Sequence, residues 1–354
     1  MRSDRLMSLA PVMAAALIAE LLAGPARADD IKLTETGSTL LYPLFNVWVS
    51  EYTKTHPGVA ISTASTGSGA GLDQALSGGV QIGASDAYMS DQQARRNPQI
   101  VNIPLAISAL MVNYNIPGFG SNNLKLDGPT LGDIYTGKVK MWDDAEIAGL
   151  NPGVNLPHQT IVPVRRSDAS GDTFVFTQYL TFSAPSWEGS IGYGTTVSWP
   201  AVASSVAAEG NEGVSKAIQQ TPYSLAYIGV SYHTDIEKVG LGMAALKSYS
   251  GEFLLPNPDS IAAASASLGP RTPTDERLTL VNAPGVNAYP LVNYEYVIVS
   301  KKQANPEMAA GIRRFLHWAS APDEANAKYL DDAHFIPLPP HIWVLTYDQI
   351  ETIR

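Results

Sequence analysis

The sequence predicts an α/β protein built from two domains, and three observations support that prediction. Segments with strand-like patterns alternate with segments of helical periodicity through much of the chain, which favours α/β layers over an all-β sandwich. The length of 354 residues suits two domains better than one. Two long apolar β-like runs, 103–114 and 289–299, lie far apart in the chain. They suit two crossings between domains, and equally two ordinary core strands.

The first third of the chain predicts alternating strands and helices that end in polar clusters. In order, the pattern predicts a strand, an amphipathic helix, a second strand, the start of a second helix and a buried strand, at 31–35, 44–55, 59–66, 72–76 and 82–86. Ligands of open α/β sheets collect at the carboxyl ends of strands. Three polar clusters of this chain fall at strand ends before helices, so we expect a ligand site there.

Helices are predicted towards the end of the chain. The segment 306–320 has helical spacing, a further helix is predicted at 322–330, and three prolines interrupt the chain before a last short segment. The segment 257–273 predicts a helix with loose flanks. If the two long runs cross near residues 109 and 292, one lobe (lobe I) comprises 29–108 and 293–354, and the other (lobe II) comprises 109–292.

The first 28 residues have the pattern of an export signal. Arg2 and Arg5 precede an apolar stretch at 9–22, and Ala26-Arg27-Ala28 is a small-x-small cleavage site. We expect cleavage after about Ala28 and a mature protein outside the cytoplasm. The chain has no cysteine, which excludes a lipobox anchor, disulfides, a thiolate metal site and a cysteine nucleophile.

The charge of the chain excludes some partners. Removing residues 1–28 removes three arginines and two acidic residues and leaves 20 basic and 31 acidic residues, a net charge of −11. This charge predicts no basic face for nucleic acid. An acidic protein can still bind an anion, because short-range donors act within a few ångströms while the distant field is screened by salt.

The segment 165–172 is a candidate anion site. It is a charged, glycine-containing turn that leads directly into an apolar helix. The first N–H groups of a helix have no intrahelical partner and carry the positive end of its dipole. Arg166 adds a planar set of donors and Ser170 adds a hydroxyl. By itself the segment also fits an ordinary N-cap beside a surface ion pair, which is the commoner arrangement.

Four motifs together strengthen the anion-site interpretation. The segments 35–43 (ETGSTLLYP), 66–71 (TGSGAG), 83–87 (GASDA) and 165–172 (RRSDASGD) occur in an order and spacing that resemble the periplasmic phosphate-binding protein (PstS) family of the high-affinity phosphate ABC importer. Supporting stretches at 130–137, 142–144 and 150–153 are similar too, and the resemblance covers nearly all of residues 31–340.

The resemblance implies a two-lobed periplasmic-binding-protein fold of type II, in which each lobe is a mixed sheet flanked by helices and two crossing strands join the lobes. It implies a monomeric carrier, not an enzyme, that binds inorganic phosphate between the lobes and delivers it to the membrane permease of the transporter. No metal or organic cofactor is implied. The residues that it assigns to phosphate are Ser38, Thr39, Leu40, Ser68, Asp86, Arg166, Ser170, Gly171 and, where the sequence departs from the family pattern, Asp172, with Asp168 orienting Arg166.

Two carboxylates of this set need a separate explanation. A carboxylate beside an anion repels it unless the ligand donates a proton, so Asp86 should select phosphate over fully ionised sulfate but not over arsenate. Asp172 stands where many family members have a threonine donor. It is either a favourable charge at a helix N-terminus or a second acceptor that favours monobasic phosphate, in which case affinity falls as pH rises.

Other classes of function remain as alternatives. A phosphate-ester hydrolase would also need an anion site, but the six histidines lack metal-ligand spacing and Ser68 is not in a G-x-S-x-G motif. A surface adhesion protein with a vestigial site is the other alternative, and phosphate titration would separate it from a receptor.

Overall fold

The computed structural model describes residues 31–120 and 124–354, so the predicted export signal at 1–28 lies outside the described residues. The chain forms a mixed α/β structure, as predicted. The predicted first strand and first helix are confirmed as β1 (Ile31–Gly37) and α2 (Tyr42–Thr55). Among the described residues, no helix is both long enough and apolar enough to span a bilayer.

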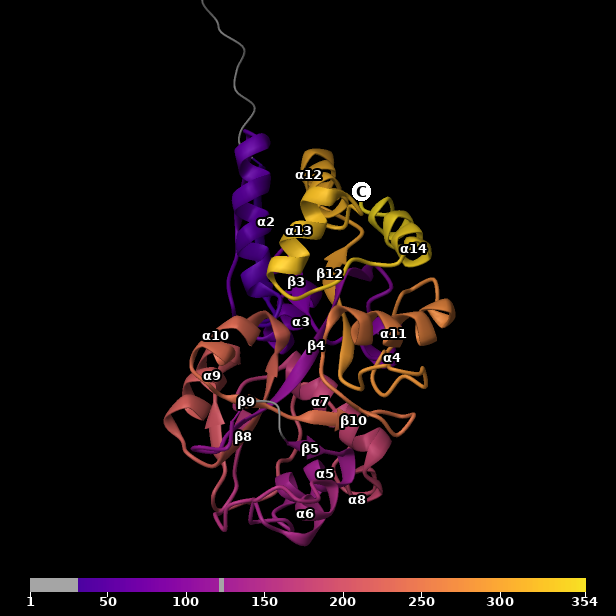
Figure 1. The fold of residues 1–354 in the computed structure, drawn as a ribbon. Helices are drawn as coiled ribbons and strands as arrows, with labels where there is room; N and C mark the ends of the chain where they lie inside the picture. The colour runs from indigo at the N-terminus through magenta and orange to yellow at the C-terminus, as the bar shows by residue number, and fades with distance from the viewer. Residues whose placement is uncertain (1–30, 121–123) are drawn as a thin grey trace, which may run out of the picture.

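A large mixed sheet runs through the molecule (Figure 1). Its strand order is β2-β1-β3-β12-β4-β8-β6-β7, with β9 also paired to β4. The bounds of the strands not yet given are β2 Val59–Ser62, β3 Ile82–Ser85, β4 Ile100–Asn115, β6 Val162–Arg166, β7 Val206–Ala208, β8 Ser224–Gly229, β9 Gly242–Met243 and β12 Val292–Ser300. A second sheet of three strands contains β5 (Lys125–Leu126), β10 (Ala245–Lys247) and β11 (Phe253–Leu254).

Helices cover the sheet and fill the ends of the molecule (Figure 1). Besides α2, the helices are α3 Ser68–Ser77, α4 Asp91–Arg96, α5 Gly128–Thr136, α6 Ala145–Leu150, α7 Gly171–Ser183, α8 Pro185–Glu188, α9 Gly210–Gln220, α10 His233–Lys238, α11 Pro258–Leu268, α12 Pro306–Ala319, α13 Glu324–Asp332 and α14 Pro340–Ile350. The predicted helices at 257–273, 306–320 and 322–330 are therefore confirmed as α11, α12 and α13, with ends that differ by a few residues.

The strand β4 connects the two parts of the large sheet. Its residues 100–109 pair with β12, whereas residues 110–115 pair with β8, so its partner changes between Ala109 and Leu110. Nearly the whole strand is buried, which requires apolar residues on both of its faces. Figure 1 shows β4 passing from the half that contains α2 and α12 to the half that contains α5 and α6. The exact lobe limits stay a prediction.

Two predicted strands differ in length from the structure. The predicted strand at 59–66 ends at Ser62, before the chain turns towards α3. The predicted run at 289–299 begins as a strand only at Val292, because Pro290 has no N–H to donate to a ladder. Tyr289 and Leu291 are still fully buried. The apolar pattern therefore predicted the burial of these residues correctly, but the predicted start of the strand was wrong.

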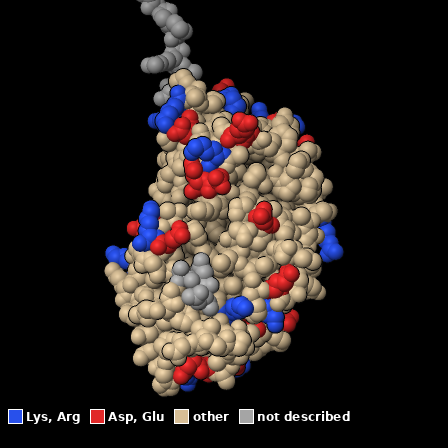
Figure 2. All heavy atoms as spheres, viewed as in Figure 1, with Lys and Arg blue, Asp and Glu red and all other residues tan. Residues whose placement is uncertain are grey.

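The segment before β12 contacts both halves of the chain. Arg277 donates to the carbonyl of Met89 at 3.1 Å and pairs with Asp91, both near α4. Thr279 donates to Gln178 of α7 at 2.6 Å. On the face that Figure 2 shows, acidic and basic side chains lie interspersed on the surface.

Gly37 provides a test of the packing at the end of β1. Its φ of 144° is a conformation that side chains rarely adopt, and a Cβ there would lie 1.9 Å from the carbonyl oxygen of Ala84. We expect Gly37→Ala to lower stability by about 3 kcal/mol or more. Gly78 also has positive φ, but a Cβ there meets nothing within 4 Å, so Gly78→Ala should lower stability by only about 1–2 kcal/mol. Equal melting temperatures in thermal unfolding would contradict the packing argument.

Candidate anion-binding site

Four segments meet where strands end and helices begin. Ser38 follows β1, Ser68 begins α3, Asp86 follows β3, and Gly171 begins α7 directly after the turn that follows β6. The predicted residues at these positions are almost fully buried. The predicted strand-end clusters lie close together, because β1 and β3 are parallel neighbours and their carboxyl ends lie at one edge of the sheet. That this region binds a ligand stays a prediction.

Asp86 accepts hydrogen bonds from two of the predicted serines. The Ser38 hydroxyl donates to Asp86 Oδ1, and the Ser68 hydroxyl donates to Oδ2 at 3.1 Å. Asp86 as a whole is only 2% exposed. Burial raises the pKa of the Asp86 carboxyl, and its hydrogen bonds and the charge of Arg166 oppose that rise only in part.

Arg166 lies between two carboxylates. Its Nε donates to Asp168 Oδ1 at 2.8 Å, its Nη2 pairs with Asp168 Oδ2, and its Nη1 pairs with Asp172. Burial acts to lower the pKa of Arg166, but Asp172 and Asp168 outweigh it and leave that pKa raised. The contact with Asp168 agrees with the predicted orienting role. The contact with Asp172 was not predicted.

Asp172 has one engaged and one free oxygen. Its Oδ2 accepts from Arg166 and from Asn211 Nδ2, the latter at 2.7 Å, whereas its Oδ1 is buried and has no hydrogen-bond partner. Burial foremost, together with the charges of Asp86 and Asp168, raises the pKa of Asp172 to about 7, although Arg166 and Asn211 act to lower it. Asp172 is therefore more than a surface charge at a helix start.

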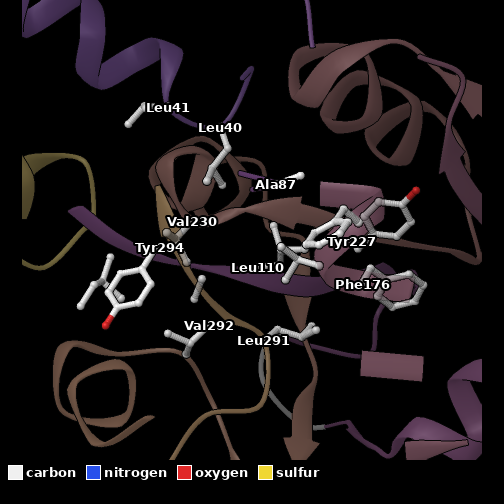
Figure 3. Packing of buried hydrophobic residues seen from close by; sticks show 14 of the residues in the cluster. Leu40, Leu41, Ala87, Leu110, Phe176, Tyr227, Val230, Leu291, Val292 and Tyr294 are labelled. Atoms are coloured by element: carbon white, nitrogen blue, oxygen red, sulfur yellow. The ribbon is translucent and has the colours of Figure 1, made fainter. Parts of the chain in front are cut away.

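The start of α2 supplies the remaining predicted residues. Thr39 Oγ1 accepts from the backbone N–H of Asn211 at 3.2 Å and from its side-chain amide at 2.9 Å. The Leu40 side chain points into the apolar cluster that contains Val230 (Figure 3) and packs on Gly229, where a Cβ would lie 1.7 Å from Leu40 Cδ1. The Leu40 side chain is therefore part of the core, and the predicted contact of its main chain with a ligand stays a prediction.

The segments of the two predicted lobes approach each other closely. A Cβ on Gly171 would lie 2.2 Å from Asp86 Oδ2 and 2.4 Å from the Ser68 hydroxyl oxygen, so no larger residue fits in this arrangement. Gly69 N–H donates to the carbonyl of Ala169 at 2.9 Å. Ser170 caps α7 by accepting from the N–H of Thr173 at 3.2 Å, so its ordinary capping role is also present.

Sequence reasoning missed two residues of this site. Asn211 connects Thr39, Asp172 and, through its Oδ1, the N–H of Gly229 at 2.9 Å. It follows Gly210 at the start of α9, so the strand-end rule applied to β7 could have found it. Glu295 lies fully buried in β12 beside Asp86. A single carboxylate inside the apolar run at 289–299 was the available signal.

The fold and this cluster of buried polar side chains are those of a two-lobed solute-binding protein. A model of the PBP superfamily domain matches residues 23–322. The chain is 35% identical to the phosphate-binding protein PstS of Methanocaldococcus jannaschii, with 82% of this chain and 79% of that protein covered. It is 32% identical to PstS of Pasteurella multocida, with 88% and 87% covered. The chain belongs to the PstS family of phosphate-binding proteins.

Solved structures agree on the fold. A phosphate-binding protein from Stenotrophomonas maltophilia superposes with a TM-score of 0.69 at 18% identity, covering 90% of this chain and 93% of that chain. A high-affinity periplasmic phosphate-binding protein, solved with bound phosphate at pH 8.5, gives a TM-score of 0.70 at 20% identity, with 88% and 92% covered. The predicted two-lobed fold is therefore confirmed.

The raised pKa of Asp172 predicts how stability depends on pH. The pKa of Asp172 is about 7 in the folded protein and 3.8 as an ordinary value. The protonated side chain therefore contributes its whole stabilising free energy below pH 3.8, and this contribution is lost as the pH rises towards 7. An asparagine side chain at this position would mimic the neutral acid at every pH. The free energy of unfolding of Asp172→Asn, measured with urea and taken relative to that of the wild type, should therefore be about 2 kcal/mol higher at pH 8 than at pH 5.

The matched control for this measurement is Asp73→Asn, because Asp73 is exposed on α3. It should leave the pH dependence of stability unchanged. If Asp172→Asn and the wild type differ by the same free energy at both pH values, Asp172 does not hold the proton in the folded protein.

Proposed function

We propose that this protein is an extracytoplasmic receptor that binds inorganic phosphate between its lobes and delivers it to the membrane permease of an ABC importer. The observation that carries the proposal is a buried acceptor, Asp86, which accepts from Ser38 and Ser68 and lies within the electrostatic reach of the buried Arg166. Membership of the PstS family supports the same ligand. An export signal at 1–28, a monomeric state and delivery to the permease complete the proposal.

The ligand would be held by donors from both lobes. The backbone N–H groups and hydroxyls at the starts of α2, α3 and α7 suit the oxygens of a tetrahedral anion. The residues concerned are Ser38, Thr39, Leu40, Ser68, Ser170 and Gly171. Arg166 would compensate the charge of the anion. Asp168 accepts a hydrogen bond from Arg166 Nε and would hold the guanidinium in a fixed orientation.

Asp86 would decide which anion binds. An ionised carboxylate can face an anion only where the anion donates a proton between them, which phosphate and arsenate can do and sulfate cannot. A buried acceptor facing an unprotonated oxygen carries the full penalty of an unmade hydrogen bond. Sites built around one such bond reject a ligand that lacks it by roughly 10⁴–10⁵-fold.

Calorimetric titration of the mature protein, freed of bound phosphate by partial unfolding, tests this function. We expect tight binding of phosphate and arsenate and little response to sulfate. Asp86→Asn places an amide donor in the same space, so the preference for phosphate over sulfate should fall at least about 100-fold. Absence of phosphate binding in the wild type would contradict the receptor function. Equal phosphate and sulfate binding would contradict the role of Asp86.

The free Oδ1 of Asp172 supports a second acceptor role. It is buried and unpartnered, while its other oxygen is fixed by Arg166 and Asn211. Two carboxylate acceptors in one cleft suit a phosphate that carries two protons. At pH values where unbound phosphate is dibasic and Asp172 of the ligand-free protein is ionised, the binding of phosphate with two protons requires the uptake of one proton from solvent.

Affinity should therefore be highest near neutral pH and weaken about tenfold per unit at higher pH. Below pH 7 the affinity should weaken as well, because Asp172 is protonated in the ligand-free protein and must release its proton when phosphate binds. Asp172→Thr restores a donor and should remove the weakening above pH 7. Calorimetric dissociation constants between pH 5.5 and pH 8.5 measure this, and a flat wild-type profile would show that Asp172 is not an acceptor for the ligand.

The relatives are binding proteins, and the hydrolase alternative finds little support in the site. Among residues 31–120 and 124–354, no group of three or more histidine or acidic side chains could hold a metal ion. Ser68 contacts Asp86, not a histidine base. Incubation with a phosphate monoester in the same calorimeter separates the alternatives, because sustained heat from turnover would favour a hydrolase.

A further inference from the structure

Glu295 lies directly opposite Asp86 in the register of the sheet. The strands β12 and β3 run antiparallel, with Val297 paired to Ala84 and Tyr296 paired to Ser85. One step further along this register brings Glu295 opposite Asp86, the first residue after β3. On the other side of β12, the pairing with β4 shifts between Glu295 and Tyr296, and such a bulge changes the direction of neighbouring side chains.

The two oxygens of Glu295 have different environments. Oε1 accepts from the Ser108 hydroxyl at 2.5 Å and from the Asn293 amide at 3.4 Å. Oε2 is buried and receives no donor. The strand register places Glu295 beside Asp86, and a hydrogen bond between the two carboxyls acts to raise the pKa of Glu295 and to lower the pKa of Asp86. This pattern suits a carboxylic acid in which Oε1 is the carbonyl oxygen and Oε2 carries the proton.

Two ionised carboxylates in these positions would repel each other strongly. Opposite residues in a sheet have Cβ atoms about 5 Å apart, and like charges there are destabilising. Glu295 is fully buried and Asp86 is nearly so. The charged or titratable groups that act on this pair are each other, Asp172 of α7 and, on Asp86, Arg166 at the end of β6. One proton between the carboxyls removes the repulsion and makes a hydrogen bond.

We propose that Glu295 holds this proton, donates it in a hydrogen bond to Asp86, and thereby acts as a positioning residue that keeps Asp86 an acceptor. The inference rests on the proposed function, because it explains how the selectivity of the phosphate site is maintained. Burial foremost, and then the charge of Asp86, hold the pKa of Glu295 well above its usual range, whereas the hydrogen bond from Glu295 acts to lower the pKa of Asp86.

The consequence concerns the proton on Asp86. With donors from Ser38 and Ser68 and, in this proposal, from Glu295, the ligand-free protein keeps Asp86 as an ionised carboxylate that can accept a proton from the ligand. Without the donor at 295, the buried Asp86 takes up a proton itself. A protonated Asp86 is a donor, and a donor in that place accommodates sulfate as readily as phosphate. Glu295 thus determines anion selectivity without contacting the anion.

The test compares Glu295→Gln with Glu295→Met by calorimetry with phosphate and sulfate. Glutamine keeps the size, the acceptor for Ser108 and a donor for Asp86, so we expect the wild-type preference for phosphate within about threefold. Methionine keeps the length but has no donor, so the preference should fall at least about 30-fold. Thermal unfolding establishes that both variants are folded.

Two outcomes would overturn the inference. If the methionine variant keeps the wild-type preference, Asp86 needs no donor from position 295. If the glutamine variant loses the preference as fully as the methionine variant, the negative charge or the packing of Glu295 matters and its proton does not. If the wild-type protein itself does not bind phosphate, the result would instead contradict the proposed function.

A second measurement needs no ligand and remains available if the methionine variant does not fold. The infrared difference spectrum between ligand-free wild type and Glu295→Gln at pH 7 should contain the C=O stretch of one protonated carboxylic acid. A difference spectrum that contains only ionised carboxylate bands would contradict the proposal. Other buried acids, such as Glu35 and Glu276, are common to both proteins and cancel.

Discussion

The candidate site depends on one buried cation, the guanidinium of Arg166. Its side chain is 1% exposed, and its two ion-pair partners are Asp168 and Asp172. Breaking a buried ion pair leaves an uncompensated charge, which costs far more than losing a surface pair. Asp86 and Glu295 lie buried nearby. Among the described residues, this part of the interior thus holds four carboxyls and one guanidinium, and burial favours the protonated form of the carboxyls that have no cation beside them.

This imbalance connects the stability of the protein with the chemistry of its ligand. Burial favours the neutral form of each excess carboxyl, because an unpaired ion in the interior is poorly solvated. An entering anion adds still more negative charge to the same volume. It can be accommodated where it brings protons of its own, as phosphate does, or where it takes donors of Arg166 from Asp172. The arrangement of acids thereby selects for a protonated oxyanion.

The sequence predicted the parts of the fold and site that depend on local pattern. The strand-end clusters around Ser38, Ser68 and Asp86 were found because parallel strands place their carboxyl ends together. The Asp172 contact with Arg166, the bridge made by Asn211 and the pairing of Glu295 with Asp86 were not found. Each joins residues through tertiary geometry or register, and Glu295 is 209 positions from Asp86 in the chain. The end of the strand at Ser62 likewise depends on where the chain must turn to reach α3.

The close approach of the two predicted lobes adds a constraint on how a ligand reaches this cleft. Gly171 lies so near Asp86 and Ser68 that no Cβ fits between them, and Gly69 donates directly to the carbonyl of Ala169. Asp86 and Ser68 are almost inaccessible to solvent in this arrangement.

An anion can reach Asp86 only when these segments separate. Because β4 is continuous through both parts of the sheet, such a separation must bend or twist at that strand and at the chain before β12. Such an opening would expose the buried carboxyls to water, which lowers the free-energy penalty on their ionised forms, so we expect lobe opening to favour proton release.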